Sequence, residues 1–238
     1  MSKVKVGVFG AGGRMGLEIQ SLLEEHRTLE PFVGVDRKGR SSRFRHVVRD
    51  LNEHEASLAD LWIDFSTADS FDEILEFVRA HKKPLVSGTT GLSLAQKRAM
   101  REASLTAPIL WASNMSLGVA VLRQAIRLFG QLEGFDFQIE EFHHRRKKDN
   151  PSGTAVTLQE TLVEAVGQEI PAPVGIRGGG IFGVHKVWAM SDEEVLMFEH
   201  QALNRAVFAR GALRAADWLS PQGPGLYGME DILLKENL

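Results

Sequence analysis

A glycine-rich loop near the N-terminus constrains the fold of this chain more than any other feature. The loop GAGGRMG, at residues 10–16, follows a short β-branched run at 3–9 and precedes a segment with helical spacing at 15–25. Glycines at a strand–helix junction permit a tight turn and let backbone N–H groups approach a pyrophosphate at the helix N-terminus. The loop therefore predicts a parallel-sheet domain that binds a nucleotide, although glycine-rich turns also serve for packing alone.

Strand-like and helix-like segments alternate through the first half of the chain. Short apolar runs typical of buried strands occupy residues 29–35, 61–65, 84–87 and 109–112, and helical spacing occurs at 70–79 and 93–103. This alternation favours a parallel sheet with right-handed crossovers. We expect a Rossmann-like α/β dinucleotide-binding domain over residues 1–114.

The pattern changes after Asn114. Helices are predicted at residues 118–129, 154–166 and 211–219, and strands at 135–142, 176–188 and 194–201. The first of these strands alternates apolar and polar residues, as a half-exposed antiparallel strand does. We expect a smaller α+β domain over residues 115–205, in which helices cover one face of a mostly antiparallel sheet.

Composition narrows the class of protein. The 238 residues contain no cysteine, which excludes disulfides, thiolate catalysis and cysteine-bound zinc, and we predict no metal site. The net charge of −3 gives no reason to expect a nucleic-acid partner. We find no signal-peptide pattern and no apolar run of about 18 residues, so we expect a cytoplasmic protein without a membrane partner.

An acidic residue at the end of the second predicted strand suits a dinucleotide. Asp36 lies 20 residues after Gly16, where a carboxylate can accept hydrogen bonds from the adenosine ribose hydroxyls. Arg37, Lys38 and Arg40 follow it and could pair with the 2′-phosphate of NADPH, or could simply form an exposed basic loop. The sequence therefore predicts NADH, NADPH or both as cofactor.

Two further loops lie where a dinucleotide would continue. Residues 88–91 (GTTG) close the fourth strand and residues 112–115 (ASNM) close the fifth. Ligands of open parallel sheets cross the carboxyl ends of the strands, so these small and hydroxylated residues suit a nicotinamide ring. Ordinary turns are the alternative interpretation.

The segment EEFHHRRKKDNPSGTA, at residues 140–155, carries the side chains best suited to chemistry. Histidine and lysine move protons and hold carboxylates near neutral pH. The Pro-Ser-Gly-Thr turn opens a predicted helix, whose N-terminal N–H groups favour an anion. The segment thus combines a proton donor, a cation and an anion site, unless it is only a solvated basic loop.

These motifs, in this order along nearly the whole chain, resemble the 4-hydroxy-tetrahydrodipicolinate reductase (dihydrodipicolinate reductase) family. The resemblance implies NAD(P)H-dependent reduction of 4-hydroxy-tetrahydrodipicolinate, a small cyclic imine dicarboxylate, in lysine and diaminopimelate synthesis. It also implies that residues 206–238 complete the first domain, and that the sheet of the second domain assembles a homotetramer.

The resemblance further implies roles for individual residues. His143 matches the proton donor, Lys147 the catalytic lysine, and His144, Gly153 and Thr154 the residues that contact the substrate. The matching cofactor contacts are Gly10, Ala11, Gly12, Gly13, Arg14, Met15, Asp36, Arg37, Gly88, Thr89, Thr90, Ala112, Ser113, Asn114 and Met115.

Some positions depart from the family pattern. Asn150 stands where alanine is usual, Met115 stands where phenylalanine or proline is common, and the loop at 37–51 is rich in arginine. Two alternative functions remain on the sequence alone. One is another NAD(P)-dependent oxidoreductase of a small carboxylated substrate. The other is a non-catalytic NAD-sensing protein whose basic segment at 143–148 binds a partner or nucleic acid.

Overall fold

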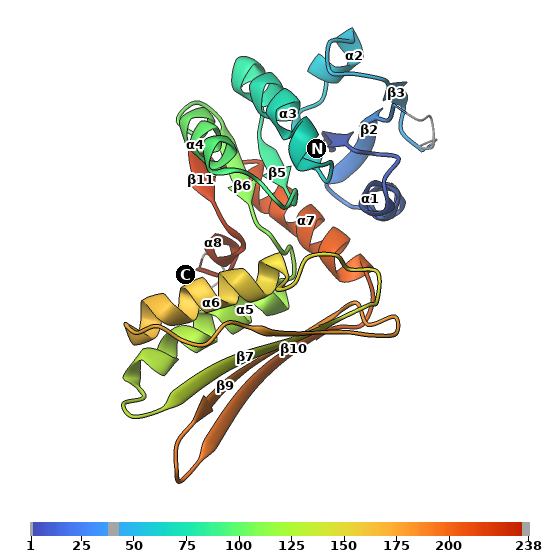
Figure 1. The fold of residues 1–238 in the computed structure, drawn as a ribbon. Helices are drawn as coiled ribbons and strands as arrows, with labels where there is room; N and C mark the ends of the chain where they lie inside the picture. Colours follow the sequence, from blue (N-terminus) through green and yellow to red (C-terminus); the bar gives the residue numbers. More distant parts are fainter. Residues whose placement is uncertain (1, 38–42, 235–238) are drawn as a thin grey trace. The chain divides into compact units, whose positions relative to one another are not determined.

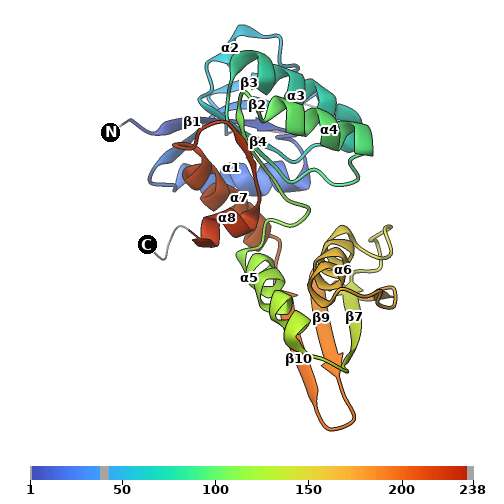
Figure 2. The ribbon, with the colours of Figure 1, turned by 90° about the vertical axis from the view of Figure 1, so that its left-hand side faces the viewer.

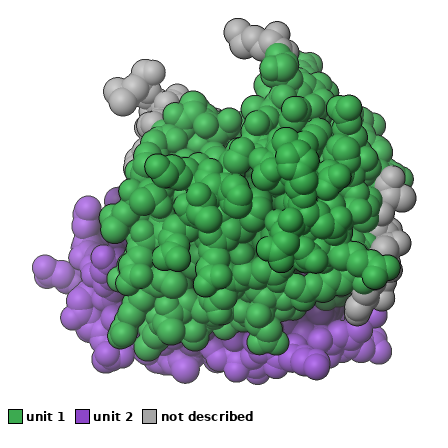
Figure 3. Space-filling view, turned by 90° about the horizontal axis from the view of Figure 1, so that it is seen from above, with its two compact units in different colours: residues 1–115, 208–238 green, residues 116–207 purple. Residues whose placement is uncertain are grey.

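The computed structural model describes residues 2–37 and 43–234. Its contacts divide the chain into two compact units (Figure 3). Unit 1 comprises residues 1–115 and 208–238, and unit 2 comprises residues 116–207. The sequence led us to expect domains at 1–114 with 206–238, and at 115–205.

Unit 1 is built on a seven-stranded sheet in which every strand pair is parallel, in the order β11-β6-β5-β4-β1-β2-β3. The strands are β1 (Val4–Phe9), β2 (Leu29–Val35), β3 (His46–Val48), β4 (Leu61–Asp64), β5 (Leu85–Ser87), β6 (Pro108–Trp111) and β11 (Gly225–Tyr227). The helices are α1 (Arg14–Glu24), α2 (His54–Ser57), α3 (Ala68–His81), α4 (Leu94–Ala103), α7 (Ala206–Leu219) and α8 (Met229–Leu234).

Helices cover both faces of this sheet. Figures 1 and 2 show α3 and α4 on one face, and α1 and α7 on the other. A parallel sheet covered on both faces needs largely apolar strands, and in β4 three apolar residues, Leu61 to Ile63, are buried ahead of the buried Asp64. Each large apolar side chain buried in this way stabilises the fold by about 1.5–3 kcal/mol. The predicted Rossmann-like α/β class is confirmed.

Unit 2 contains a four-stranded sheet in the order β10-β9-β7-β8. The strands are β7 (Asp136–His143), β8 (Val174–Arg177), β9 (Gly183–Met190) and β10 (Val195–Ala202). Helices α5 (Leu117–Ile126) and α6 (Gly153–Val166) lie on one face of this sheet in both views, and a 3₁₀ turn, η1 (Arg127–Gln131), extends α5 (Figures 1 and 2). Alternate residues of β7 are buried, as predicted for a strand with one covered face.

Two details differ from the sequence prediction, and one agrees with it. The single strand predicted at 176–188 is wrong, because Gly178, Gly179 and Gly180 interrupt it and separate β8 from β9. β8 pairs with β7 in parallel while the other pairs are antiparallel, so the sheet is mostly antiparallel, as predicted. The arginine-rich loop contains β3, which adds an edge strand to the first sheet.

The helices were compared with the length and apolarity that a membrane span requires. None of those within residues 2–37 and 43–234 is long and apolar enough to cross a bilayer.

Candidate functional site

The glycine-rich loop borders a cavity of about 350 Å³ in unit 1. Its lining includes Gly10, Gly12, Gly13, Asp36, Arg37 and Phe65. The cavity lies where β1 and β2 end and α1 begins, which is where a parallel sheet of this kind binds a dinucleotide.

The shape of this loop depends on glycine. Gly10 has φ of +82°, a left-handed conformation that side chains with a β-carbon rarely adopt. A β-carbon on Gly12 would lie 2.5 Å from the carboxylate of Asp36. Among the described residues no side chain caps the N-terminus of α1, and its first turn holds no acidic residue. The loop and this helix end therefore fit the pyrophosphate of a dinucleotide.

Asp36 and Arg37 occupy different environments at the end of β2. Asp36 is buried beside the loop, whereas the exposed guanidinium of Arg37 lies 2.5 Å from Oε2 of Glu73 on α3. A 2′-phosphate would have to compete with Glu73 for Arg37. Lys38 and Arg40, the other predicted phosphate partners, lie outside the described residues.

The loop after β5 is held by a buried carboxyl group. Thr89 is only 1% exposed, and its hydroxyl donates a hydrogen bond of 2.8 Å to Oδ2 of Asp64. Ser87 donates to the same oxygen at 2.7 Å, and burial raises the pKa of Asp64. The hydroxyl of Thr89 therefore shapes the loop, while Thr90 beside it is exposed.

The remaining predicted cofactor residues vary in exposure. Met115 is 1% exposed. Ala112, Ser113, Asn114, Met15 and Gly88 are half-buried, Arg14 is exposed and Ala11 is buried.

The principal polar cluster of unit 2 lies at the carboxyl end of β7. Glu141 and His143 point to the same face of this strand, and both are buried. Nδ1 of His143 lies 2.9 Å from Oε2 of Glu141, and Nε2 of His185 on β9 lies 3.9 Å from the same oxygen. A histidine is thus paired with a carboxylate that is shielded from water.

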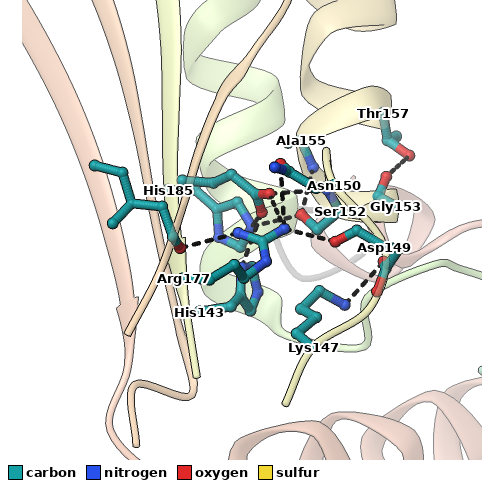
Figure 4. A network of polar contacts seen from close by, with 12 residues as sticks. His143, Lys147, Asp149, Asn150, Ser152, Gly153, Ala155, Thr157, Arg177 and His185 are labelled. Carbon is teal, nitrogen blue, oxygen red and sulfur yellow. Dashed lines mark hydrogen bonds and ion pairs between the residues drawn. The ribbon is translucent and has the colours of Figure 1, made fainter. Parts of the chain in front are cut away.

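Arg177, the last residue of β8, joins this cluster to the loop that follows β7. Its Nη2 donates hydrogen bonds of 2.6 Å to Oε1 of Glu141 and 2.6 Å to the carbonyl oxygen of Asp149 (Figure 4). It also donates to Oδ1 of Asn150 at 3.5 Å. A β-carbon on Gly175 would lie 1.8 Å from that same oxygen. The unusual Asn150 therefore packs against a glycine and an arginine of β8.

The surroundings of Glu141 and His185 shift the pKa values of both side chains. Burial opposes ionisation of Glu141, but its close contact with His143 and its hydrogen bonds from Ser152 and Arg177 outweigh burial and hold the pKa of Glu141 well below its usual range. Burial and the neighbouring His143 lower the pKa of His185 to about 3. Near neutral pH, Glu141 is therefore an anion and His185 is neutral.

Glu141, His143 and His185 also bring three potential metal-ligand atoms together. Arg177 already supplies a cation 2.6 Å from Glu141, however, and two positive groups on one carboxylate would repel each other. The cluster is better described as a carboxylate that pairs an arginine with a histidine.

Lys147 and the start of α6 share one carboxylate. Nζ of Lys147 lies 2.9 Å from Oδ2 of Asp149 (Figure 4), and the backbone N–H of Gly153 also stabilises this carboxylate. Burial opposes ionisation of Asp149, but Lys147 and these backbone groups lower its pKa. Asp149 therefore occupies the anion site that the sequence predicted for a substrate carboxylate.

The two other predicted substrate contacts differ in accessibility. His144 is half-buried, and burial lowers its pKa. Thr154 lies in the first turn of α6, as predicted, but it is only 7% exposed. This burial counts against its role as a carboxylate ligand. Ser152 is the N-cap of α6, and its hydroxyl accepts a hydrogen bond of 3.2 Å from the N–H of Ala155.

Sequence reasoning missed Glu141, Asp149, Arg177 and His185. Glu141 had a signal, because it stands two residues before His143 on a strand and so shares its face. Asp149 stands two residues after Lys147 in the same loop. Arg177 and His185 come from other strands, and only the sheet pairing brings them to the site.

Family models match both parts of the chain. One described as dihydrodipicolinate reductase, N-terminus, matches residues 4–115, and one described as dihydrodipicolinate reductase, C-terminus, matches residues 115–233. The chain belongs to the dihydrodipicolinate reductase family. The family predicted from the sequence is confirmed, and the N-terminal domain of this family binds a dinucleotide, NADH or NADPH.

Individual relatives support the same family. A 4-hydroxy-tetrahydrodipicolinate reductase of Bdellovibrio bacteriovorus is 49% identical over 233 residues, which cover 98% of this chain and 97% of the relative. One from Wolinella succinogenes is 40% identical and covers 96% of this chain and 98% of the relative. A dipicolinate-bound dihydrodipicolinate reductase from Paenisporosarcina sp. TG-14 has the same fold, with a TM-score of 0.82 at 20% identity, and covers 97% of this chain and 100% of that structure.

Proposed function

We propose that this protein catalyses the NAD(P)H-dependent reduction of 4-hydroxy-tetrahydrodipicolinate to tetrahydrodipicolinate in lysine and diaminopimelate synthesis. Membership of the dihydrodipicolinate reductase family supports the reaction class. The observation that carries the proposal is the cluster at the end of β7. There His143, in contact with a carboxylate, precedes Lys147 and the start of α6 at Gly153.

The residues of each unit have separate tasks in this reaction. A bound reduced nicotinamide supplies the hydride. The glycine-rich loop and Asp36 bind the dinucleotide. Lys147, His144 and the start of α6 bind the substrate carboxylates, because cations and backbone N–H groups are the natural partners of such anions. His143 donates the proton that the reduced ring requires, with Lys147 beside it as the second cationic group.

A spectrophotometric assay tests this function. Substrate generated enzymatically is mixed with the protein and with NADH or NADPH, and oxidation of the cofactor is followed. We expect turnover with both cofactors. Turnover of simple hydroxy acids without turnover of the cyclic imine would identify a different oxidoreductase. Cofactor binding with no turnover of any substrate would identify a nucleotide-sensing protein.

Cofactor choice depends on Arg37. Arg37→Ala should raise the KM for NADPH and leave the KM for NADH nearly unchanged, because a guanidinium pairs with a 2′-phosphate that NADH lacks. Since Glu73 already neutralises Arg37 in this structure, NADH is expected to be mildly preferred by the unchanged protein. Steady-state kinetics with each cofactor measure both effects. An equal loss with both cofactors would assign Arg37 a purely structural role.

Thr154, which is only 7% exposed, gives a second test. Thr154→Val keeps the shape of the side chain and removes the hydroxyl, so the KM for the substrate should rise if this group binds a carboxylate. Val156, an exposed residue of the same helix, provides the matched control as Val156→Thr. An unchanged KM in Thr154→Val would mean that Thr154 only packs the first turn of α6.

The outer face of the second sheet supports the homotetramer that the family resemblance implies. Glu141 and His143 face the helices, so Glu140 and Phe142 point to the opposite face. Sheet pairing places exposed apolar side chains on that opposite face, and these are Val174, Ile176, Val195 and Met197. An exposed apolar patch of this kind marks a protein interface. We assign the reductase to the cytoplasm, with no nucleic-acid or membrane partner.

A further inference from the structure

Glu141 is a fully buried acidic residue in a strand whose other inward-facing residues include Phe137 and Ile139. A hydrophobic side chain at this position would provide burial without the free-energy cost of taking a charge out of water. Packing alone therefore does not explain why an acidic residue is buried at this position.

The two oxygens of Glu141 have different partners. Oε1 accepts hydrogen bonds from Nη2 of Arg177 at 2.6 Å and from the backbone N–H of Ser152 at 2.9 Å. Oε2 is left to face the histidines, at 2.9 Å from Nδ1 of His143. The two atoms are close, although the contact lies outside the alignment of a regular hydrogen bond. Arg177 and Ser152 thus fix the carboxylate so that one oxygen is directed at one ring nitrogen.

We propose that Glu141 is a positioning residue that keeps a hydrogen on Nδ1 of His143 and so makes Nε2 the atom that transfers the proton. This inference rests on the proposed reductase function, in which His143 is the proton donor. An ionised carboxylate can only accept hydrogen bonds, so Nδ1 facing it must carry the hydrogen. The protonated ring then holds a second hydrogen on Nε2, which it can donate.

The other charged groups around His143 are basic or already paired, so Glu141 is the acid that can orient its ring. Arg177 from β8 and Lys147 and His144 from the loop after β7 are basic, and Asp149 in the same loop is paired with Lys147. His185 from β9 stays neutral near neutral pH because burial lowers its pKa. Among these described neighbours, Glu141 is the acid that contacts the ring of His143. Its negative charge lies 2.9 Å from Nδ1 of that ring.

The opposing interpretation is structural. Glu141 ties β7 to β8 through Arg177 and to the N-cap of α6 through Ser152, and it could be needed for nothing else. The two roles predict different responses to Glu141→Gln. The amide oxygen can still accept from Arg177 and Ser152, which preserves the ties. The amide nitrogen then faces Nδ1 of His143 as a donor, which forces the ring hydrogen onto Nε2 and disfavours the imidazolium.

The test compares Glu141→Gln with Glu140→Gln in the full-length protein. Glu140 is adjacent on β7 but on the outer face, where its Oε2 accepts a hydrogen bond of 3.1 Å from Nε1 of Trp188. Glu141→Gln should lower kcat by about 10²-fold, with the KM for NADH unchanged. The limb of the kcat–pH profile that reports the proton donor should move to lower pH. Glu140→Gln should retain both the rate and the profile.

Three outcomes would overturn the inference. The first is an unchanged kcat in a folded Glu141→Gln variant. The second is a lower kcat with an unmoved pH profile, which would reveal a structural role. The third concerns the unchanged protein, so it holds even if the variant fails to fold. NMR chemical shifts of the ring nitrogens should show the hydrogen of neutral His143 on Nδ1, and finding it on Nε2 would contradict the proposal. The NMR result does not depend on turnover, so it also separates this inference from failure of the proposed function.

Discussion

His143→Ala is expected to lower kcat by about 10²–10⁴-fold, the usual contribution of a general acid, while the Kd for NADH stays unchanged. His143 is 6% exposed at the end of β7 in unit 2, whereas the nucleotide cavity is formed by residues of unit 1. The substitution therefore removes the proton donor without touching a predicted dinucleotide contact. Steady-state kinetics and a cofactor titration measure the two quantities independently.

A double variant sharpens this test. If Glu141 acts through His143, combining Glu141→Gln with His143→Ala should cost no more rate than His143→Ala alone, since residues that act as a unit are not additive. Full additivity would show that the two side chains act separately. A His143→Ala protein with undiminished kcat would remove His143 from the mechanism altogether.

The parts of the fold that were predicted correctly are those with a strong local pattern. The run that became β1 is apolar and β-branched and ends at a glycine loop, so its strand and the following α1 could be placed within a residue or so. By contrast, β3 has only three residues in an arginine-rich segment, too short for a periodic pattern. Its place at the sheet edge is determined by pairing with β2, which the local sequence does not encode.

In the candidate site, too, some residues could be predicted from a local motif and others depend on strand pairing. His143, Lys147 and Gly153 belong to one short segment, so the sequence alone could bring them together. Arg177 is 34 residues from His143, and their pairing depends on β8 running parallel to β7. The glycines at 178–180, which separate β8 from β9, fell inside the single strand that the sequence predicted at 176–188. Sheet pairing, rather than a local motif, therefore brings Arg177 and His185 to the cluster around Glu141 and His143.

In the loop after β7, the carboxylate of Asp149 lies where a substrate carboxylate is proposed to bind. Asp149 contacts both Lys147 and the N–H of Gly153, the two groups proposed to bind a substrate carboxylate. If Lys147 and Gly153 bind a substrate carboxylate as proposed, the substrate displaces Asp149 and gains Lys147 as its cation. Removing Lys147 would leave Asp149 unpaired beside the incoming dicarboxylate, where like charges repel.

Lys147→Ala should for this reason lower kcat by about 10²–10⁴-fold, as expected for a proton-transfer group, and raise the KM for the substrate as well. Lys148→Ala is the matched control, because Lys148 is the next residue in the same loop and is exposed. Adding Asp149→Asn to Lys147→Ala should recover part of the KM, since it removes the repelling charge, but none of the lost kcat. Affinity for NADH should be unchanged throughout. Full kcat in Lys147→Ala would exclude this lysine from catalysis, and an equal loss in Lys148→Ala would mean that only the summed charge of the loop matters.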